Sequence, residues 1–257
     1  MHSVDTFAIE AGTETLAADR ISANGKTQCL FLHGAGSSSR ARWLHLRLAL
    51  AKQGVGSVAI DFSGHGDSSA RTPGSLAKRY SEACHALGYV DSDEPRVVVG
   101  VSMSGEIAVR LAVEASHRIS GLVTIVGAAY DPAAFDVAFG PRFTEILRNH
   151  ESWRRSEIFS AIQSFAGRVT VIQASEDDVV PAAIGGDLVR NAVHAEHVEQ
   201  LVLTGVGHAV SGVLDSNVGL IDDVASAIAR AAHTSAEPAV LAPRQACRNV
   251  AAIETPE

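Results

Sequence analysis

The chain has 257 residues, of which 46% are hydrophobic and 19% charged, and its formal net charge is −8. This balance is typical of one soluble globular domain with a substantial buried core. The net negative charge argues against a nucleic-acid partner, because phosphate binding needs concentrated lysine and arginine. The sequence contains no run of about 18 apolar residues, so it predicts no membrane span.

The first residues lack the basic start and apolar run of a secretory signal, so we expect a cytoplasmic protein. The three cysteines, Cys29, Cys84 and Cys247, are scattered along the chain. Their odd number and spacing favour reduced thiols and predict neither a disulfide framework nor a metal site. The glycine-rich segments match neither a dinucleotide-binding motif nor a P-loop, so we expect no cofactor.

Predicted strands and helices alternate along the chain. The ranges are an opening hairpin of 5–11 and 14–22, strand 27–32, helix 40–53, strand 56–61, helix 73–88, strand 96–101, helix 103–116 and strand 119–127. Further strands are predicted at 169–174 and 201–203, and a last helix follows Asp215 or Ser216, either of which can cap it. This order predicts an α/β fold with a mostly parallel central sheet of about eight strands, flanked by helices.

The strand at 27–32 opens into a His-Gly-Ala-Gly loop at residues 33–36. Small residues in such a loop allow a backbone N–H to approach a substrate oxygen, and Ala35 is the residue expected to donate it. We interpret His33 and His65 as structural residues that brace glycine-rich loops.

Three arginines, Arg40, Arg42 and Arg47, follow the glycine-rich loop. Two interpretations of them are open. They can form a solvated helix face, or they can meet an anionic end of a substrate. The first is favoured, because charged residues spaced along a surface helix are usually solvated.

An apolar strand at residues 97–101 runs into Ser102 and out into a helix. Gly100 and Ser104 are small, which allows the backbone to double back and present the hydroxyl of Ser102 on a tight turn. The usual motif has glycine in place of Ser104. Ser104 itself is a poor alternative nucleophile, because one of its flanking residues is then a glutamate.

The helix that follows has an apolar face and a polar face. Its apolar residues recur every four positions, at Met103, Ile107, Leu111 and Ala115. This spacing predicts a face packed on the sheet, with Glu106, Arg110 and Glu114 pointing away from it.

A serine nucleophile needs a histidine base and an acid that orients the histidine. The segment at 175–181, after a buried strand, carries the candidate acids Asp177 and Asp178. Farther on, His208 follows a strand in a glycine-rich setting. The other histidines are expected on polar helix faces or helix ends and have no motif around them.

Four motifs occur together in one order: the glycine-rich loop at residues 33–36, the Asp-x-x-Gly-x-Gly-x-Ser run at 61–68, the turn at Ser102, and the pair Asp177 and His208. In these motifs the chain resembles the α/β-hydrolase superfamily of esterases, lipases, thioesterases, lactonases and C–C hydrolases, over about residues 20 to 232.

The resemblance implies that Ser102 is the nucleophile, His208 the general base and Asp177 its orienting acid. It also implies oxyanion donors from the backbone N–H groups of Ala35 and Met103. Asp178 is the rival acid. The family usually places the acid three residues after a small residue and four before a proline, and Ala174 and Pro181 give this spacing to Asp177.

The same resemblance predicts a catalytic domain over residues 1–233, with a short lid insertion at 131–167 and a disordered tail at 234–257. The insertion is rich in aromatic residues: Phe135, Phe139, Phe143, Trp153, Phe159 and Phe165. These rings can be the core-facing side of small amphipathic helices, which is the favoured interpretation, or some can cover an apolar acyl pocket.

The expected function is a serine hydrolase that cleaves an ester, thioester or lactone of a small to medium apolar acyl group. The partner is therefore a small-molecule acyl substrate. Acyl transfer and C–C bond hydrolysis use the same residues and stay open, as does a non-catalytic ligand-binding relative on the same fold.

Overall fold

The computed structural model describes residues 2–24, 26, 28–91, 93, 95–115 and 118–232. The predicted tail at 234–257 lies outside the described residues, so the tail and the domain limit at residue 233 stay predictions. Within the described residues, no helix is long and apolar enough to cross a membrane.

In the described part of the chain, eight strands form one sheet in the order β1-β2-β4-β3-β5-β6-β7-β8. The strands are β1 (Asp5–Ala11), β2 (Glu14–Ile21), β3 (Cys29–Leu32), β4 (Ser57–Ile60), β5 (Arg96–Val101), β6 (Ile119–Ile125), β7 (Arg168–Ala174) and β8 (His197–Leu203). Strand β2 pairs antiparallel with β1 and β4, and the other neighbours are parallel. The predicted fold class is confirmed.

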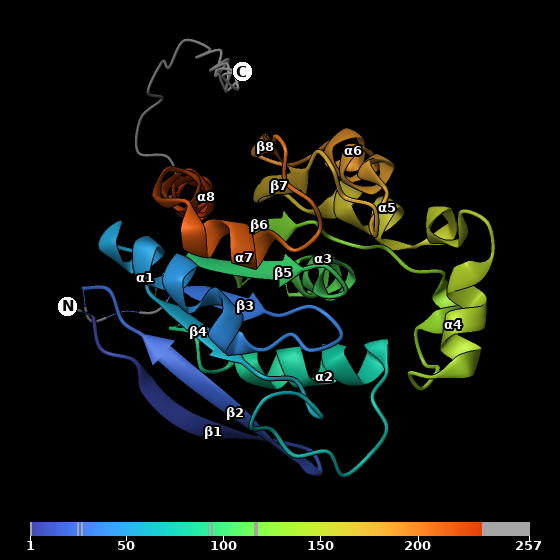
Figure 1. Cartoon of the computed structure of the whole chain (residues 1–257), viewed down its shortest axis with the longest axis horizontal. Helices are drawn as coiled ribbons and strands as arrows, with labels where there is room; N and C mark the ends of the chain where they lie inside the picture. Colours follow the sequence, from blue (N-terminus) through green and yellow to red (C-terminus); the bar gives the residue numbers. More distant parts are fainter. Residues whose placement is uncertain are drawn as a thin grey trace, which may run out of the picture.

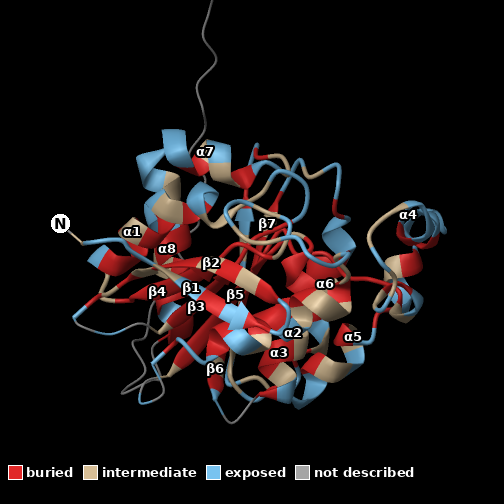
Figure 2. Cartoon of the chain, turned by 90° about the horizontal axis from the view of Figure 1, so that it is seen from below, coloured by how far each residue is buried: buried red, intermediate tan, exposed pale blue. Residues whose placement is uncertain are grey.

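Helices cover both faces of the sheet (Figure 1). One layer contains α1 (Leu44–Lys52), α7 (Val210–Ser216) and α8 (Val218–Ala232). The other contains α2 (Leu76–Leu87), α3 (Ser104–Glu114), α5 (Ile158–Ala161) and α6 (Ala182–Asn191). Every residue of the central strands β3, β4 and β5 is buried, as a parallel sheet covered on two sides requires (Figure 2).

The segment between β6 and β7 holds several short helices. They are η2 (Pro132–Ala134), α4 (Pro141–Arg148), η3 (Ser152–Arg155), α5 and η4 (Ile162–Ser164). Helix α4 stands away from the sheet in both views (Figures 1 and 2). Phe143 and Phe165 are buried in the core, and the other phenylalanines of the segment pack against it. A lid role for residues 131–167 stays a prediction.

The helix predicted at 40–53 begins as a 3-10 helix, η1 (Arg40–Trp43), and continues as α1 to Lys52. Other local predictions were wrong. Asp215 and Ser216 belong to helix α7, which was not predicted, and Asn217 caps α8 instead by accepting the N–H of Leu220 at 3.1 Å. His197 begins β8 and is not at a helix end.

The prediction that Glu106 points away from the core was also wrong, because its exposed fraction is 0%. Its carboxylate accepts from Arg110 Nε at 2.8 Å, from the Tyr130 N–H at 3.1 Å and from Ser156 Oγ at 2.8 Å. Burial raises the pKa of Glu106, and the Arg110 charge opposes that shift. The Glu106 side chain therefore links helix α3 to the chain on both sides of α4, at Tyr130 before that helix and at Ser156 after it.

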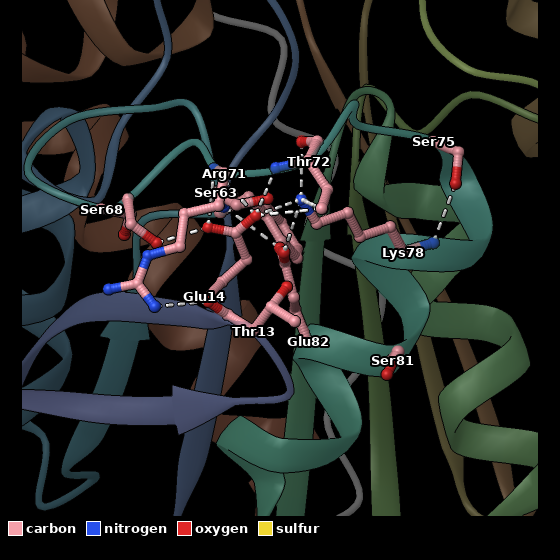
Figure 3. Close-up of polar contacts among 12 residues, drawn as sticks. Thr13, Glu14, Ser63, Ser68, Arg71, Thr72, Ser75, Lys78, Ser81 and Glu82 are labelled. Carbon is pink, nitrogen blue, oxygen red and sulfur yellow. Dashed lines mark hydrogen bonds and ion pairs between the residues drawn. The ribbon is translucent and has the colours of Figure 1, made fainter.

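A second buried carboxylate fixes the opening hairpin to helix α2 (Figure 3). Glu14, the first residue of β2, accepts the backbone N–H groups of Arg71 and Thr72 and the Lys78 ammonium, with the Lys78 Nζ 2.7 Å away. The Ser69 hydroxyl donates to the same carboxylate. These donors hold the pKa of Glu14 well below its ordinary value, with Lys78 the largest cause.

Candidate active site

Ser102 lies on the turn between β5 and α3, and its φ angle is +48°. This left-handed conformation is strained for a residue with a side chain, so neighbouring contacts must hold it. The Ser102 N–H donates to Ile125 O at 3.0 Å, and the Ser102 carbonyl accepts from Gly105 and Ala128. Gly100 has to be glycine, because a Cβ there lies 2.1 Å from the Ser104 carbonyl oxygen. The turn presents the Ser102 hydroxyl as the sequence predicted.

The sheet brings His208 and Asp177 to this hydroxyl, each from a loop that follows a strand. Ser102 Oγ lies 3.0 Å from His208 Nε2. On the other side of the ring, His208 Nδ1 lies 2.9 Å and 3.0 Å from the two carboxylate oxygens of Asp177. This chain of contacts selects the tautomer with the proton on Nδ1, which leaves Nε2 free to accept the Ser102 proton.

Asp177 and its rival Asp178 occupy different environments. The Asp177 side chain is 5% exposed, and its Oδ1 also accepts the N–H groups of Val179 and Val180, each at 2.9 Å. Asp178 is less buried and lines a cavity beside His208. The geometry therefore favours Asp177 as the partner of the imidazole.

The glycine-rich loop lies against Ser102. A Cβ on Gly34 would lie 3.1 Å from the Cβ of Ser102, so the loop backbone packs closely against this serine. Ala35 lines two cavities that both reach Ser102. The second predicted donor, Met103, directly follows Ser102 at the start of α3. Both predicted oxyanion donors are thus beside Ser102.

His33 and His65 brace loops. His33 Nδ1 donates to the Gly34 carbonyl at 2.8 Å, and His33 Nε2 accepts the Phe62 N–H at 3.0 Å. Burial and the nearby Arg79 charge lower the pKa of His33 well below its ordinary value, so the ring is neutral. His65 Nδ1 donates to the Ser63 carbonyl at 3.2 Å.

Residues 29–222 match the sequence model of the alpha/beta hydrolase family. The chain belongs to this family.

Individual relatives are more distant. The chain is 32% identical over 120 residues to a multifunctional-autoprocessing repeats-in-toxin of Vibrio cholerae, a match that covers 44% of the chain and 3% of the length of that toxin. It is 27% identical over 199 residues to an uncharacterised protein of Mycobacterium tuberculosis, covering 76% of the chain and 68% of that protein. The structure of a Pyrococcus furiosus esterase superposes with a TM-score of 0.67 at 18% identity, over 89% of this chain and 93% of the esterase.

Two cavities of this alpha/beta hydrolase meet at Ser102. The larger, about 500 Å³, is also lined by His208, and its mixed walls include the polar residues Ser37, Arg42 and Ser211 beside apolar ones such as Trp43 and Val210. The smaller, about 370 Å³, lies toward the segment between β6 and β7. Its walls are mostly apolar, with Ala128, Ala129, Tyr130, Leu147, Trp153, Val180 and Ile184 among them. The two cavities share Ala35, Ser102 and Val179.

The three arginines after the glycine-rich loop have different surroundings. Arg40 pairs with Asp61, and its Nε lies 3.1 Å from an Asp19 oxygen. Arg47 is fully buried and pairs with Asp19, so the interpretation of a solvated face was wrong for these two. Arg42 is exposed as expected, but it lines the larger cavity of the hydrolase.

Sequence reasoning missed several residues of this region. Two rings line the smaller cavity: Trp153, which was among the aromatic residues predicted to cover an acyl pocket, and Tyr130, which was not predicted, whereas no phenylalanine lines it. Arg79 was also missed, although a signal was present. It lies three residues after Leu76 and four before Ala83, which is the spacing of a buried helix face. Among the described residues of the hydrolase, no group of three or more metal-ligating side chains gathers.

Proposed function

We propose that this alpha/beta hydrolase is a serine hydrolase that cleaves esters of small to medium apolar acyl groups. In this proposal Ser102 is the nucleophile, His208 the general base and Asp177 its orienting acid. The observation that carries the proposal is the continuous line of contacts from Ser102 Oγ through both ring nitrogens of His208 to the Asp177 carboxylate. We also propose residues 131–167 as a lid over the acyl group.

The first half of the reaction forms an acyl-enzyme. Ser102 Oγ attacks the substrate carbonyl carbon while His208 Nε2 takes the hydroxyl proton, and the carbonyl electron pair moves onto oxygen. The backbone N–H groups of Ala35 and Met103 stabilise that oxyanion. When the tetrahedral intermediate collapses, the bond to the leaving group breaks and His208 gives its proton to the departing atom.

The second half releases the acid. His208 takes a proton from water as the water oxygen attacks the acyl carbon, and a second oxyanion forms at the same donors. Collapse breaks the bond to Ser102 Oγ, which recovers its proton from His208. Asp177 stays ionised throughout and holds the Nδ1 proton, which stabilises the imidazolium in both halves.

The proposed role of His208 supports one arrangement of the substrate in the two cavities. His208 must reach the departing atom, so the leaving group lies on the side that His208 lines, in the cavity of about 500 Å³. The acyl group then lies in the cavity of about 370 Å³, whose apolar walls suit a hydrocarbon chain.

The first test is a fluorophosphonate probe with peptide mapping of the modified residue. We expect labelling at Ser102, and Ser102→Ala should lose both the labelling and the turnover of p-nitrophenyl esters. Labelling at Ser104 would contradict the assignment. If Ser102 stays unlabelled and no ester is turned over, the chain is a non-catalytic relative.

The second test compares bond types at a fixed acyl group. The kcat/KM is measured for p-nitrophenyl esters, matched thioesters and lactones. A vinylogous 1,5-diketone is added to the panel to detect C–C bond cleavage. We expect the oxygen esters to be turned over fastest. A higher kcat/KM for a thioester or the diketone would move the assignment to that bond, and faster acyl transfer to an added alcohol than to water would make the chain an acyltransferase.

A further inference from the structure

Arg79 is a buried arginine whose guanidinium serves the glycine-rich loop. It lies on helix α2 and is 3% exposed. Its Nη1 lies 3.0 Å from the Gly34 carbonyl oxygen and 3.4 Å from that of His33, and its Nη2 donates to His65 Nε2 at 3.0 Å. Among the described residues, Arg79 forms no ion pair with a carboxylate.

The charge of Arg79 is therefore not neutralised by direct contact. Its guanidinium carbon lies 4.6 Å from the ring centre of Phe62 and 5.6 Å from that of Phe139, and both rings can stabilise a cation. Burial lowers the pKa of Arg79 to about 10, so it stays protonated at neutral pH. The nearby Tyr130 and Glu82 groups oppose this lowering of the pKa, although neither forms an ion pair with Arg79. Burying a cation without a directly paired carboxylate is costly, so a purely space-filling role explains Arg79 poorly.

The bonds to the Gly34 carbonyl determine where the next N–H points. That oxygen accepts from Arg79 Nη1 and also from His33 Nδ1 at 2.8 Å. The peptide bond between Gly34 and Ala35 is trans and planar, so its carbonyl and the Ala35 N–H point in opposite directions. Arg79 and His33 both donate to the carbonyl side of this peptide, so the Ala35 N–H points to the opposite side. Gly34 lies against Ser102, which places this peptide beside the serine.

We propose that Arg79 is a positioning residue for the oxyanion: it fixes the Gly34–Ala35 peptide and, through it, polarises the Ala35 N–H toward the developing charge. The inference rests on the proposed serine hydrolase function. A positive charge on the carbonyl side of a peptide strengthens its N–H as a donor, and a water-poor site screens this effect little. Arg79 does not touch the substrate; it acts through Ala35.

The neighbouring Lys78 provides a matched control. It is also a cation on helix α2, but it pairs with Glu14 at the opening hairpin (Figure 3), and no contact with residues 33–36 is among its bonds. Lys78→Met therefore removes a charge from the same helix and weakens the fold without changing the oxyanion peptide. Arg79→Met keeps the length of the side chain, and Arg79→Lys keeps its charge with fewer donors.

The experiment measures kcat and KM for p-nitrophenyl butyrate, normalised to the endpoint stoichiometry of fluorophosphonate labelling. It also measures inhibition by a trifluoromethyl ketone, which forms an anionic adduct with serine, and by the methyl ketone of the same chain. For Arg79→Met we expect kcat to fall by about 10- to 100-fold, with KM within about twofold of the wild type. Affinity for the trifluoromethyl ketone should fall in parallel, and affinity for the methyl ketone should not.

Arg79→Lys should recover part of the lost kcat, and Lys78→Met should lower the free energy of unfolding but keep kcat per labelled site. A wild-type kcat per labelled site in Arg79→Met overturns the proposal. Equal losses of affinity for both ketones also overturn it, because they mean that Arg79 only shapes the ground-state site. If the wild-type protein neither labels nor turns over esters, the proposed function itself fails, which these measurements separate from a failure of the Arg79 proposal.

Discussion

The hydroxyl of Ser104 donates a hydrogen bond to the backbone carbonyl of His33, 2.6 Å away. It joins the turn that carries Ser102 to the glycine-rich loop that carries Ala35, so nucleophile and proposed oxyanion donor share one rigid contact. Ser104 is fully buried, and its hydroxyl is committed to this bond. The serine that replaces the usual glycine of the motif is therefore a structural link and is not presented to substrate.

Ser104→Ala should weaken this link without removing the nucleophile. The substitution removes the shorter of the two side-chain bonds to the His33 carbonyl and leaves the 3.4 Å contact from Arg79, and loss of a buried hydrogen bond costs ~1–3 kcal/mol. We expect the free energy of unfolding in urea to fall by that amount, kcat to fall severalfold, and labelling at Ser102 to persist. Loss of all labelling in Ser104→Ala, with folding intact, would contradict this role.

Asp177→Asn and Asp178→Asn should have very different effects. An amide in place of the Asp177 carboxylate would favour the wrong histidine tautomer, because its N–H₂ group can donate to Nδ1, and kcat should drop by about 10⁴. Asp178→Asn changes only a side chain in the wall of the larger cavity, and kcat should stay near the wild-type value. Steady-state kinetics on both variants check this, and a larger loss in Asp178→Asn would reassign the acid.

The proposed triad could be assembled from sequence because each member follows a strand. Ser102, Asp177 and His208 come after β5, β7 and β8, and parallel strands bring their carboxyl ends to one edge of a sheet. The roles themselves came from the resemblance of these motifs to the alpha/beta-hydrolase superfamily. The preference for Asp177 over Asp178 came from the spacing that this family usually keeps, which Ala174 and Pro181 provide.

Glu106 and Arg79 could not be assigned in the same way, because their partners are distant in sequence. Glu106 looks like an exposed residue of an amphipathic helix until Tyr130 and Ser156 approach it from the segment after β6. The helical spacing of Arg79 indicates burial, but nothing local indicates that its donors reach the carbonyl of Gly34. Tertiary contacts override helix periodicity at Glu106, whereas at Arg79 the periodicity holds and only the bonding partners come from distant residues.

Glu14 should make stability depend on pH. Its pKa is lowered in the folded state from an ordinary value of 4.5, so its contribution is fully present above that value and is lost as the pH falls toward the folded pKa. Glu14→Gln should therefore destabilise the protein at pH 7. The difference in free energy of unfolding between variant and wild type should shrink as the pH falls below about 4.5. Urea unfolding between pH 7 and pH 3 measures this, and a difference that grows toward low pH would contradict it.

The acyl chain preference should follow the size of the smaller cavity. Each methylene transferred from water into apolar walls contributes ~0.8 kcal/mol, which is about fourfold in kcat/KM, until the cavity is full. With about 370 Å³ available, kcat/KM for p-nitrophenyl esters should climb through short and medium chains and then fall. Trp153 lines this cavity, so Trp153→Ala should move the optimum to longer chains.

Glu145→Ala is the matched control, because Glu145 lies on the exposed side of α4 and does not line that cavity. It should leave the chain-length profile unchanged. A wild-type kcat/KM that keeps rising into long chains would mean that residues 131–167 do not close over the acyl group. A profile that Trp153→Ala leaves unchanged would place the acyl group in the other cavity, on the side of Arg42.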